Sequence, residues 1–258
     1  MSEWVALIRG AVTLDTAAFA TMKEAKDGFK RGLILIAIVS LAVGLIPFGV
    51  DVVRGILPRN LAAERAKAEQ GVQEFLKAFP FRPPQEPGVP SIEENIHMGM
   101  DIGFEIAALP RLLPRPIAEF FEALGTWLSL PFARAGGWMF YALVVLLVAK
   151  LLKGRATIAQ MLACTSLYVV PQTLNIVGVL LSYIRCAGGV LSAIVSLVAM
   201  VWSIVVYIKG VAVANELSNG KAILATILPA LVAGVIVLSA ASILILVGIT
   251  AGAASSAG

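Results

Sequence analysis

Five long apolar stretches constrain what this chain can fold into more than any other feature. One of them, Ala156 to Ile184, has 29 residues without a charge, and another, Cys186 to Ile208, has 23. A helix needs about 20 predominantly apolar residues to cross a bilayer. Only 14% of the chain is charged, compared with about 25% in soluble domains. We therefore predict an all-α integral membrane bundle of about five transmembrane helices with additional amphipathic interfacial helices.

From the five expected spans, we divide the chain into four parts, the last of which contains four of the spans. They run from about Gly32 to Val53, Gly136 to Leu152, Ala156 to Ile184, Cys186 to Ile208 and Ala222 to Thr250. The expected parts are a cytoplasmic amphipathic segment (1–31), the first transmembrane helix (32–53), a long extracytoplasmic loop (54–134) and a core of four transmembrane helices (135–258). The nine charges of the first segment argue against a cleaved signal peptide.

The positions of lysine and arginine predict how the chain lies in the membrane. With the N-terminus inside, ten basic residues flank the spans on the inner side and four on the outer side. Basic residues favour the cytoplasmic side, so we expect a multi-pass protein of the plasma or inner membrane with the N-terminus in the cytoplasm and the C-terminus outside. The net charge of +4 then comes from basic residues beside the spans, which face the anionic lipids of the membrane. We therefore predict no nucleic-acid partner.

The first 31 residues carry apolar side chains at helical spacing. Trp4, Leu7 and Ile8 fall on one side of a first helix, and Phe19 and Met22 on one side of a second. Such a pattern is typical of an amphipathic helix that lies on a membrane. A docking site for a soluble partner is the alternative.

The long loop between the first two spans has its own helical pattern. A charged segment from Asn60 to Phe79 precedes a proline-rich spacer, Pro80 to Pro90, and Ser91 with Glu94 has the form of a capping box. A last amphipathic helix then presents an apolar face formed by Ile117, Phe120, Phe121, Leu124 and Leu128. We interpret this loop as a partner-binding surface or, equally, as a lid over the protein's own helices.

The sequence offers little catalytic chemistry. The only histidine, His97, shares a helix face with Glu94, Asp101 and Glu105, a pattern that favours a solvated face over a weak divalent-cation site. The chain contains no phosphate-binding glycine loop, HExxH motif, nucleophile elbow or CxxC pair. We therefore expect no enzyme activity, no catalytic residues, no metal and no cofactor.

The third span contains a polar cluster that would bend it. Tyr168, Pro171, Gln172 and Asn175 interrupt otherwise apolar sequence. Proline kinks a helix in the membrane, and amide side chains satisfy the exposed backbone groups or bond to neighbouring helices. The simpler interpretation is a kinked helix packed inside the bundle, and the alternative is a lining for a solute path.

Small residues spaced four apart mark candidate helix-packing faces in the fourth span. Gly188, Ser192 and Ser196 form one row, and Gly189 with Ala193 runs beside it. Rows of small residues let helix backbones approach closely in lipid. They predict internal packing or, alternatively, the interface of a homo-oligomer or a hetero-oligomer.

The region from Trp138 to about Leu246 resembles the Yip1 domain, a five-span membrane module. The resemblance rests on Tyr168-Val-Val-Pro171 in the third span, on the tryptophan of the fourth span and on the segment Val211 to Ala222 before the last helix. The first span and its amphipathic lead fit prokaryotic members. The Asp-Leu-Tyr-Gly-Pro stretch typical of eukaryotic members is absent, so their association with Rab-type GTPases is not carried over.

The resemblance implies a non-enzymatic membrane protein, and some bacterial members accompany ABC-type exporters. Together with the missing catalytic motifs, it predicts an accessory or scaffold subunit of a larger membrane protein complex, with other membrane subunits as partners. A small-solute carrier, a channel or an exporter-associated component that uses the kinked third span is the alternative function.

Overall fold

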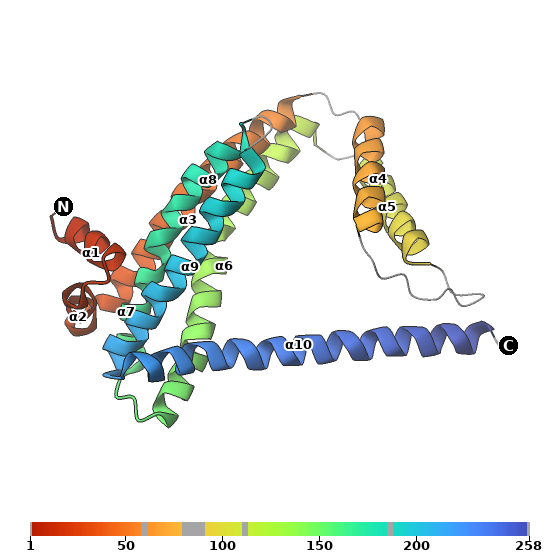
Figure 1. The fold of residues 1–258 in the computed structure, drawn as a ribbon. Coiled ribbons are helices and arrows are strands. Elements are labelled where there is room, and N and C mark those ends of the chain that lie inside the picture. Colours follow the sequence, from red (N-terminus) through yellow and green to blue (C-terminus); the bar gives the residue numbers. More distant parts are fainter. Residues whose placement is uncertain (1, 58–60, 79–90, 110–112, 185–187, 257–258) are drawn as a thin grey trace. The chain divides into compact units, whose positions relative to one another are not determined.

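The computed structural model describes residues 2–57, 61–78, 91–109, 113–184 and 188–256 (Figure 1). These residues form helices and turns, and no strand occurs among them. In chain order, the elements are α1 (Ser2–Val12), α2 (Thr16–Glu24), α3 (Gly28–Ile56), α4 (Leu61–Ala78), α5 (Ile92–Ala108), α6 (Arg115–Leu151), α7 (Ile158–Thr165), the 3-10 helix η1 (Ser166–Thr173), α8 (Leu174–Ser182), α9 (Gly188–Asn215) and α10 (Asn219–Ser256).

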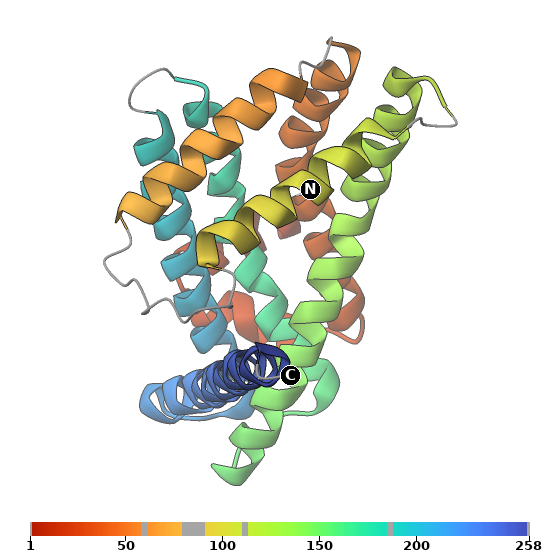
Figure 2. The same cartoon turned by 90° about the vertical axis from the view of Figure 1, so that its right-hand side faces the viewer.

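Five helical segments in the described part are long and apolar enough to cross a membrane. They are Gly28–Ile56, Arg115–Leu151, Ile158–Ser182, Gly188–Asn215 and Asn219–Ala240. The all-α fold with five spans is therefore confirmed. Residues 1–54 and 119–233 form one compact unit, the bundle, in which α3, α6, α8 and α9 run side by side (Figure 2).

The fourth span, α9, packs closely against the third. A Cβ atom added at Gly210 would lie 2.8 Å from the carbonyl oxygen of Cys164 and 3.2 Å from the Cα of Thr165. Val206 and Val211, on either side of this contact, are fully buried. The absence of a side chain at residue 210 is therefore what allows the two backbones to touch.

The third span is a broken helix that consists of α7, η1 and α8. Pro171 lies inside η1, and proline cannot donate the backbone hydrogen bond of a regular α-helix. Local side chains bond to carbonyl groups around this segment: the hydroxyl of Ser166 donates to Ala163 O (2.8 Å) and that of Thr173 donates to Val170 O (2.8 Å). These hydroxyl groups are additional donors to carbonyl oxygens in the irregular part of the span.

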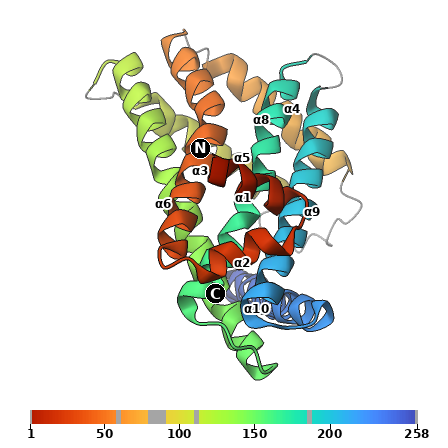
Figure 3. The ribbon, with the colours of Figure 1, turned by 90° about the vertical axis from the view of Figure 1, so that its left-hand side faces the viewer.

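The two N-terminal helices pack on the bundle, as the view in Figure 3 shows. In α2, which begins after the N-cap Asp15, Phe19 and Met22 are at most 1% exposed. The thiol of Cys164 in α7 donates a hydrogen bond to Phe19 O (3.4 Å). The apolar side of α2 is thus covered by the protein's own helices, whereas the sequence favoured a membrane surface or a soluble partner.

Helix α6 continues through the boundary expected between the loop and the membrane core. It includes Pro131 without ending there. Its first half packs on α3: the Trp127 ring stacks on Phe48 with centroids 5.2 Å apart, and its Nε1 donates to Leu41 O (3.0 Å). This aromatic contact packs the first half of α6 on α3, and the boundary between the loop and the membrane core at residue 134 stays a prediction.

The segment between α3 and α6 contains the α4–α5 hairpin. Helix α5 begins with the predicted capping box, in which Ser91 Oγ accepts from Glu94 N (3.1 Å) and Glu94 accepts from Ser91 N (2.7 Å). Arg65 of α4 bonds to Asp101 of α5 and connects the two helices. The predicted proline-rich spacer at 80–90 lies outside the described residues.

The contact at Gly210 makes a testable prediction. Gly210→Ala should lower the free energy of unfolding by about 1–3 kcal/mol, because the added methyl group meets backbone atoms that cannot rotate away. Gly189→Ala in the same helix is the matched control, since a Cβ there meets nothing within 4 Å. Thermal unfolding in a non-ionic detergent measures both. Equal midpoints for the two variants would contradict the close contact.

Candidate functional site

The polar cluster predicted in the third span lies partly in the core and partly at its edge. Pro171 is buried, and Tyr168, Gln172 and Asn175 are half-buried. The Tyr168 ring meets that of Tyr207 in α9 edge to face, with centroids 6.1 Å apart. The cluster thus joins the broken span to the neighbouring helix.

Gln172 has a partner that sequence reasoning missed. Its side-chain oxygen accepts a hydrogen bond from the guanidinium of Arg134 in α6 (2.8 Å), and both side chains are partly buried. Arg134 is one of the four basic residues that flank the expected spans on the outer side. An arginine within a membrane helix is rare and marks a functional-site hypothesis; here the amide supplies its acceptor.

Two further hydrogen bonds attach α6 to other helices of the bundle. The indole Nε1 of Trp138 donates to Thr165 Oγ1 (3.1 Å), and the hydroxyl of Tyr141 donates to Thr226 O in α10. The hydroxyl of Thr165 in turn donates to Met161 O (2.7 Å). These groups are paired, as an apolar environment requires. The buried hydroxyl of Tyr207, whose ring contacts Tyr141 and Tyr168, has no hydrogen-bond partner in the described part of the chain.

The row of small residues in α9 contacts α8. A Cβ added at Gly178 of α8 would lie 3.6 Å from Ser192 O and 3.6 Å from Ser196 Oγ. Gly188, at the start of the same row, is buried. The second row faces away: Gly189 and Ala193 are exposed, and a Cβ at Gly189 would meet no atom within 4 Å.

The apolar face expected near the start of the second span is largely open. Of its residues, Ile117, Phe121 and Leu128 are exposed, and Leu124 is half-buried. Phe120 reaches the α3 side, where its ring meets Phe48 at a centroid distance of 6.3 Å. This face therefore remains available to lipid or to another protein, while its edge packs on α3.

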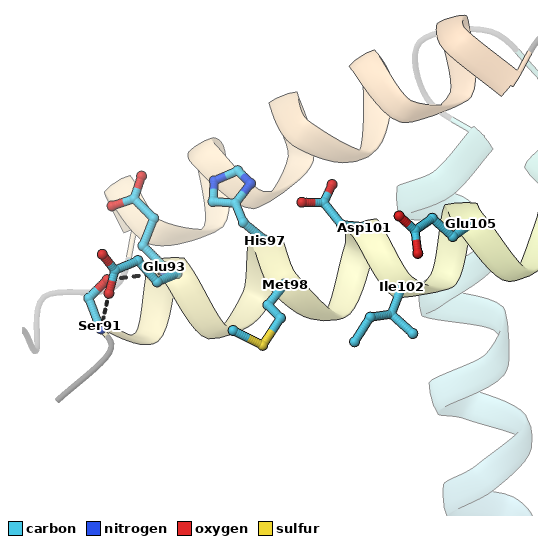
Figure 4. Close-up of a pocket in the computed structure, with 8 residues that line it drawn as sticks. Ser91, Glu93, His97, Met98, Asp101, Ile102 and Glu105 are labelled. Atoms are coloured by element: carbon cyan, nitrogen blue, oxygen red, sulfur yellow. Dashed lines mark hydrogen bonds between the residues drawn. The ribbon is translucent and has the colours of Figure 1, made fainter. Parts of the chain in front are cut away.

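A shallow pocket of about 630 Å³ lies along α5 (Figure 4), and its lining includes the predicted polar face together with the apolar residues Met98 and Ile102. His97 and Asp101 project from the same side of the helix. Asp101 already pairs with Arg65. Within the described ranges, no three histidine, cysteine, aspartate or glutamate side chains lie close enough to hold a metal ion.

The other side of α5 exposes apolar residues. Met98, Ile102 and Ile106 are spaced four apart and are 55%, 52% and 63% exposed, and Phe75 of α4 is 57% exposed. We call the α5 residues Met98, Ile102 and Ile106 the hairpin stripe. Residues four apart lie on the same face of a helix, so the stripe is continuous.

An ion pair connects two segments that are far apart in the sequence. Lys23 of α2 donates to Glu216 Oε1 (2.8 Å) and to Val213 O (3.4 Å). Arg155 approaches the same carboxylate at 3.9 Å. The hydrogen bond from Lys23, followed by its charge and that of Arg155, lowers the pKa of Glu216 from its ordinary value of 4.5.

The lowered pKa predicts how stability depends on pH. The contribution of the carboxylate is complete above the ordinary pKa of 4.5 and is lost as the pH falls through the lowered value. Glu216→Gln should therefore lower the unfolding midpoint at pH 7, and its difference from the wild type should vanish at acidic pH. Glu24→Gln, at an exposed α2 residue without an ion pair in the described part, is the control. A difference that persists below the lowered pKa would contradict this role.

Comparison with known proteins identifies the family. The sequence model of the Yip1 domain matches residues 10–241, which is most of the chain. No individual curated protein and no solved structure matches. The match includes the first span, which the predicted resemblance already contained, and extends the resemblance to the α4–α5 hairpin and the first half of α6. The chain is a multi-pass helical membrane protein that belongs to the Yip1-domain family.

Proposed function

We propose that this protein is a non-enzymatic accessory or scaffold subunit of a larger membrane protein complex. The observation that carries the proposal is the hairpin stripe, three large apolar side chains exposed in a row on a helix outside the expected spans. A large apolar surface on a segment that need not contact lipid is typical of a protein–protein interface. Membership in a non-catalytic membrane family supports the same reading.

The proposed orientation follows from the basic residues. Lys23, Lys150, Lys153, Arg155 and Lys221 all lie near helix ends or in the connections between helices. By the positive-inside rule, we infer that the helix ends with these basic residues face the cytoplasm and that the α4–α5 hairpin lies on the extracytoplasmic side of the membrane. In this orientation, the partner of the hairpin stripe is a membrane subunit or an extracytoplasmic protein. A plasma or inner membrane of a prokaryote remains our prediction for the location.

The partner role is tested on the hairpin alone, because Glu119–Ala233 belongs to the bundle. Met98→Ser, Ile102→Ser and Ile106→Ser together should abolish co-purification of a stoichiometric partner from native membranes. Glu93→Ser, His97→Ser and Glu105→Ser on the polar side of the same helix should leave it unchanged. Retention of the same partner by both triple variants, and by a chain with residues 58–113 replaced by a Gly/Ser linker, would refute the role of the hairpin.

The alternative function, a small-solute carrier, has one specific observation in its favour. The third span is broken at Pro171, and Arg134 reaches Gln172 beside the break. Broken helices and intramembrane charges both occur along transport paths.

The carrier function predicts a flux that depends on the break. Gln172→Leu and Asn175→Leu should each abolish uptake of the transported solute into proteoliposomes. Thr173→Val, whose hydroxyl bonds only to Val170 O in its own turn, should retain it. Solute uptake that is the same in the wild type and in liposomes without protein would remove this function from consideration.

A further inference from the structure

A polar pocket of about 380 Å³ lies where three spans end. Helix α6 ends at Leu151, α9 ends at Asn215 and α10 begins at Asn219. Lys153, Arg155 and Lys221 are among the residues that line the pocket. Because the walls come from the ends of membrane-spanning helices, the pocket opens at the boundary between the bilayer and the aqueous phase.

Backbone hydrogen bonds fix the two connections that form the pocket. Lys153 and Glu216 each end a helix in the left-handed conformation, with φ of 71° and 57°. The chain then bonds back, from Gly154 N to Ala149 O (2.8 Å) and from Leu217 N to Ala212 O (3.0 Å). Both connections therefore have the defined geometry of a closed helix C-terminus.

A further backbone bond holds the two connections together. Arg155 N donates to Asn215 O (3.2 Å) and thereby joins the connection after α6 to the connection after α9. The positions of the cationic side chains around the pocket are thus set by paired backbone. The two connections that form the pocket are therefore held to each other by the backbone and do not move independently.

The charge of this pocket is suited to an anion. Its single acid, Glu216, is already paired with Lys23 and approached by Arg155. Within the described ranges, Lys153 and Lys221 have no acidic partner, and both are exposed. The N-terminus of α10 lies at this end of the bundle, and the positive end of a helix dipole also favours an anion there.

A buried amide in the pocket lacks a donor. Asn215 lines the pocket and is 0% exposed. Its Nδ2 donates to Val211 O (3.1 Å), but its Oδ1 accepts no hydrogen bond in the described part of the chain. A Cβ at residue 154 would lie 2.7 Å from this oxygen, so the buried Gly154 packs directly against it and the oxygen is covered by the protein. Asn215 therefore belongs to the closed wall of the pocket.

We propose that this pocket binds the headgroup of an anionic phospholipid, such as phosphatidylglycerol. Lys153 and Lys221, with the outer part of Arg155, attract the phosphate. The acyl chains remain in the bilayer beside the span ends. A soluble phosphate ester shares the phosphate chemistry but lacks these chains. The assignment does not depend on the accessory or the carrier function.

The test titrates the purified full-length protein, in a non-ionic detergent, with dioctanoyl phosphatidylglycerol and follows the thermal unfolding midpoint. Dioctanoyl phosphatidylcholine and glycerol 3-phosphate are the comparison ligands. The double variant Lys153→Gln, Lys221→Gln should weaken phosphatidylglycerol binding about tenfold, since each basic residue near a membrane surface contributes appreciably to anionic-lipid binding. The double variant Lys26→Gln, Lys30→Gln is the matched control, because it removes the same charge from two exposed residues outside the pocket.

Each outcome decides the assignment. Weaker binding only in the pocket variant, with little response to phosphatidylcholine or glycerol 3-phosphate, supports the lipid site. Equal weakening by the control variant would overturn it, because the attraction would then be a diffuse charge effect. Glycerol 3-phosphate binding as tight as phosphatidylglycerol binding would overturn the lipid as the source of the phosphate.

Discussion

Inside a bilayer, two helices gain little from hiding apolar surface, because lipid is as apolar as they are; close packing and hydrogen bonds must hold them together. In this protein, the contact of Gly210 with the backbone of Cys164 and Thr165 meets that requirement. In the same short stretch of α7, Thr165 Oγ1 accepts a hydrogen bond from Trp138 of α6, and the thiol of Cys164 donates to Phe19 O of α2. The third span is thus the element on which the fourth span, α6 and the N-terminal helices all converge.

The sequence was sufficient for features whose physical signal is local. Long uncharged runs revealed the five spans because charges are excluded from hydrocarbon. Ser91 and Glu94 predicted the start of α5, since a capping box needs only two residues three apart. Pro171 marked the irregular segment of the third span for an equally local reason. The likeness to the Yip1 domain followed from the order of such features along the chain.

Features that depend on distant partners could not be predicted in this way. An apolar side formed by Phe19 and Met22 has the same pattern whether lipid or protein covers it, and here protein does. The approach of Arg134 to Gln172 joins residues 38 apart, and that of Lys23 to Glu216 joins residues 193 apart. The exposure of Met98, Ile102 and Ile106 likewise depends on which parts of the chain pack against α5, and the sequence pattern does not give this. The candidate site was therefore only partly visible in the sequence.

The length of α6 has a consequence for the membrane around it. Arg134 and Lys150 both belong to this helix, and at about 1.5 Å per residue they are only about 24 Å apart along its axis. The hydrocarbon core of a typical bilayer is about 30 Å thick. Lysine and arginine side chains extend toward the interface, so the two cations can lie near opposite faces of the bilayer while the helix between them remains in hydrocarbon.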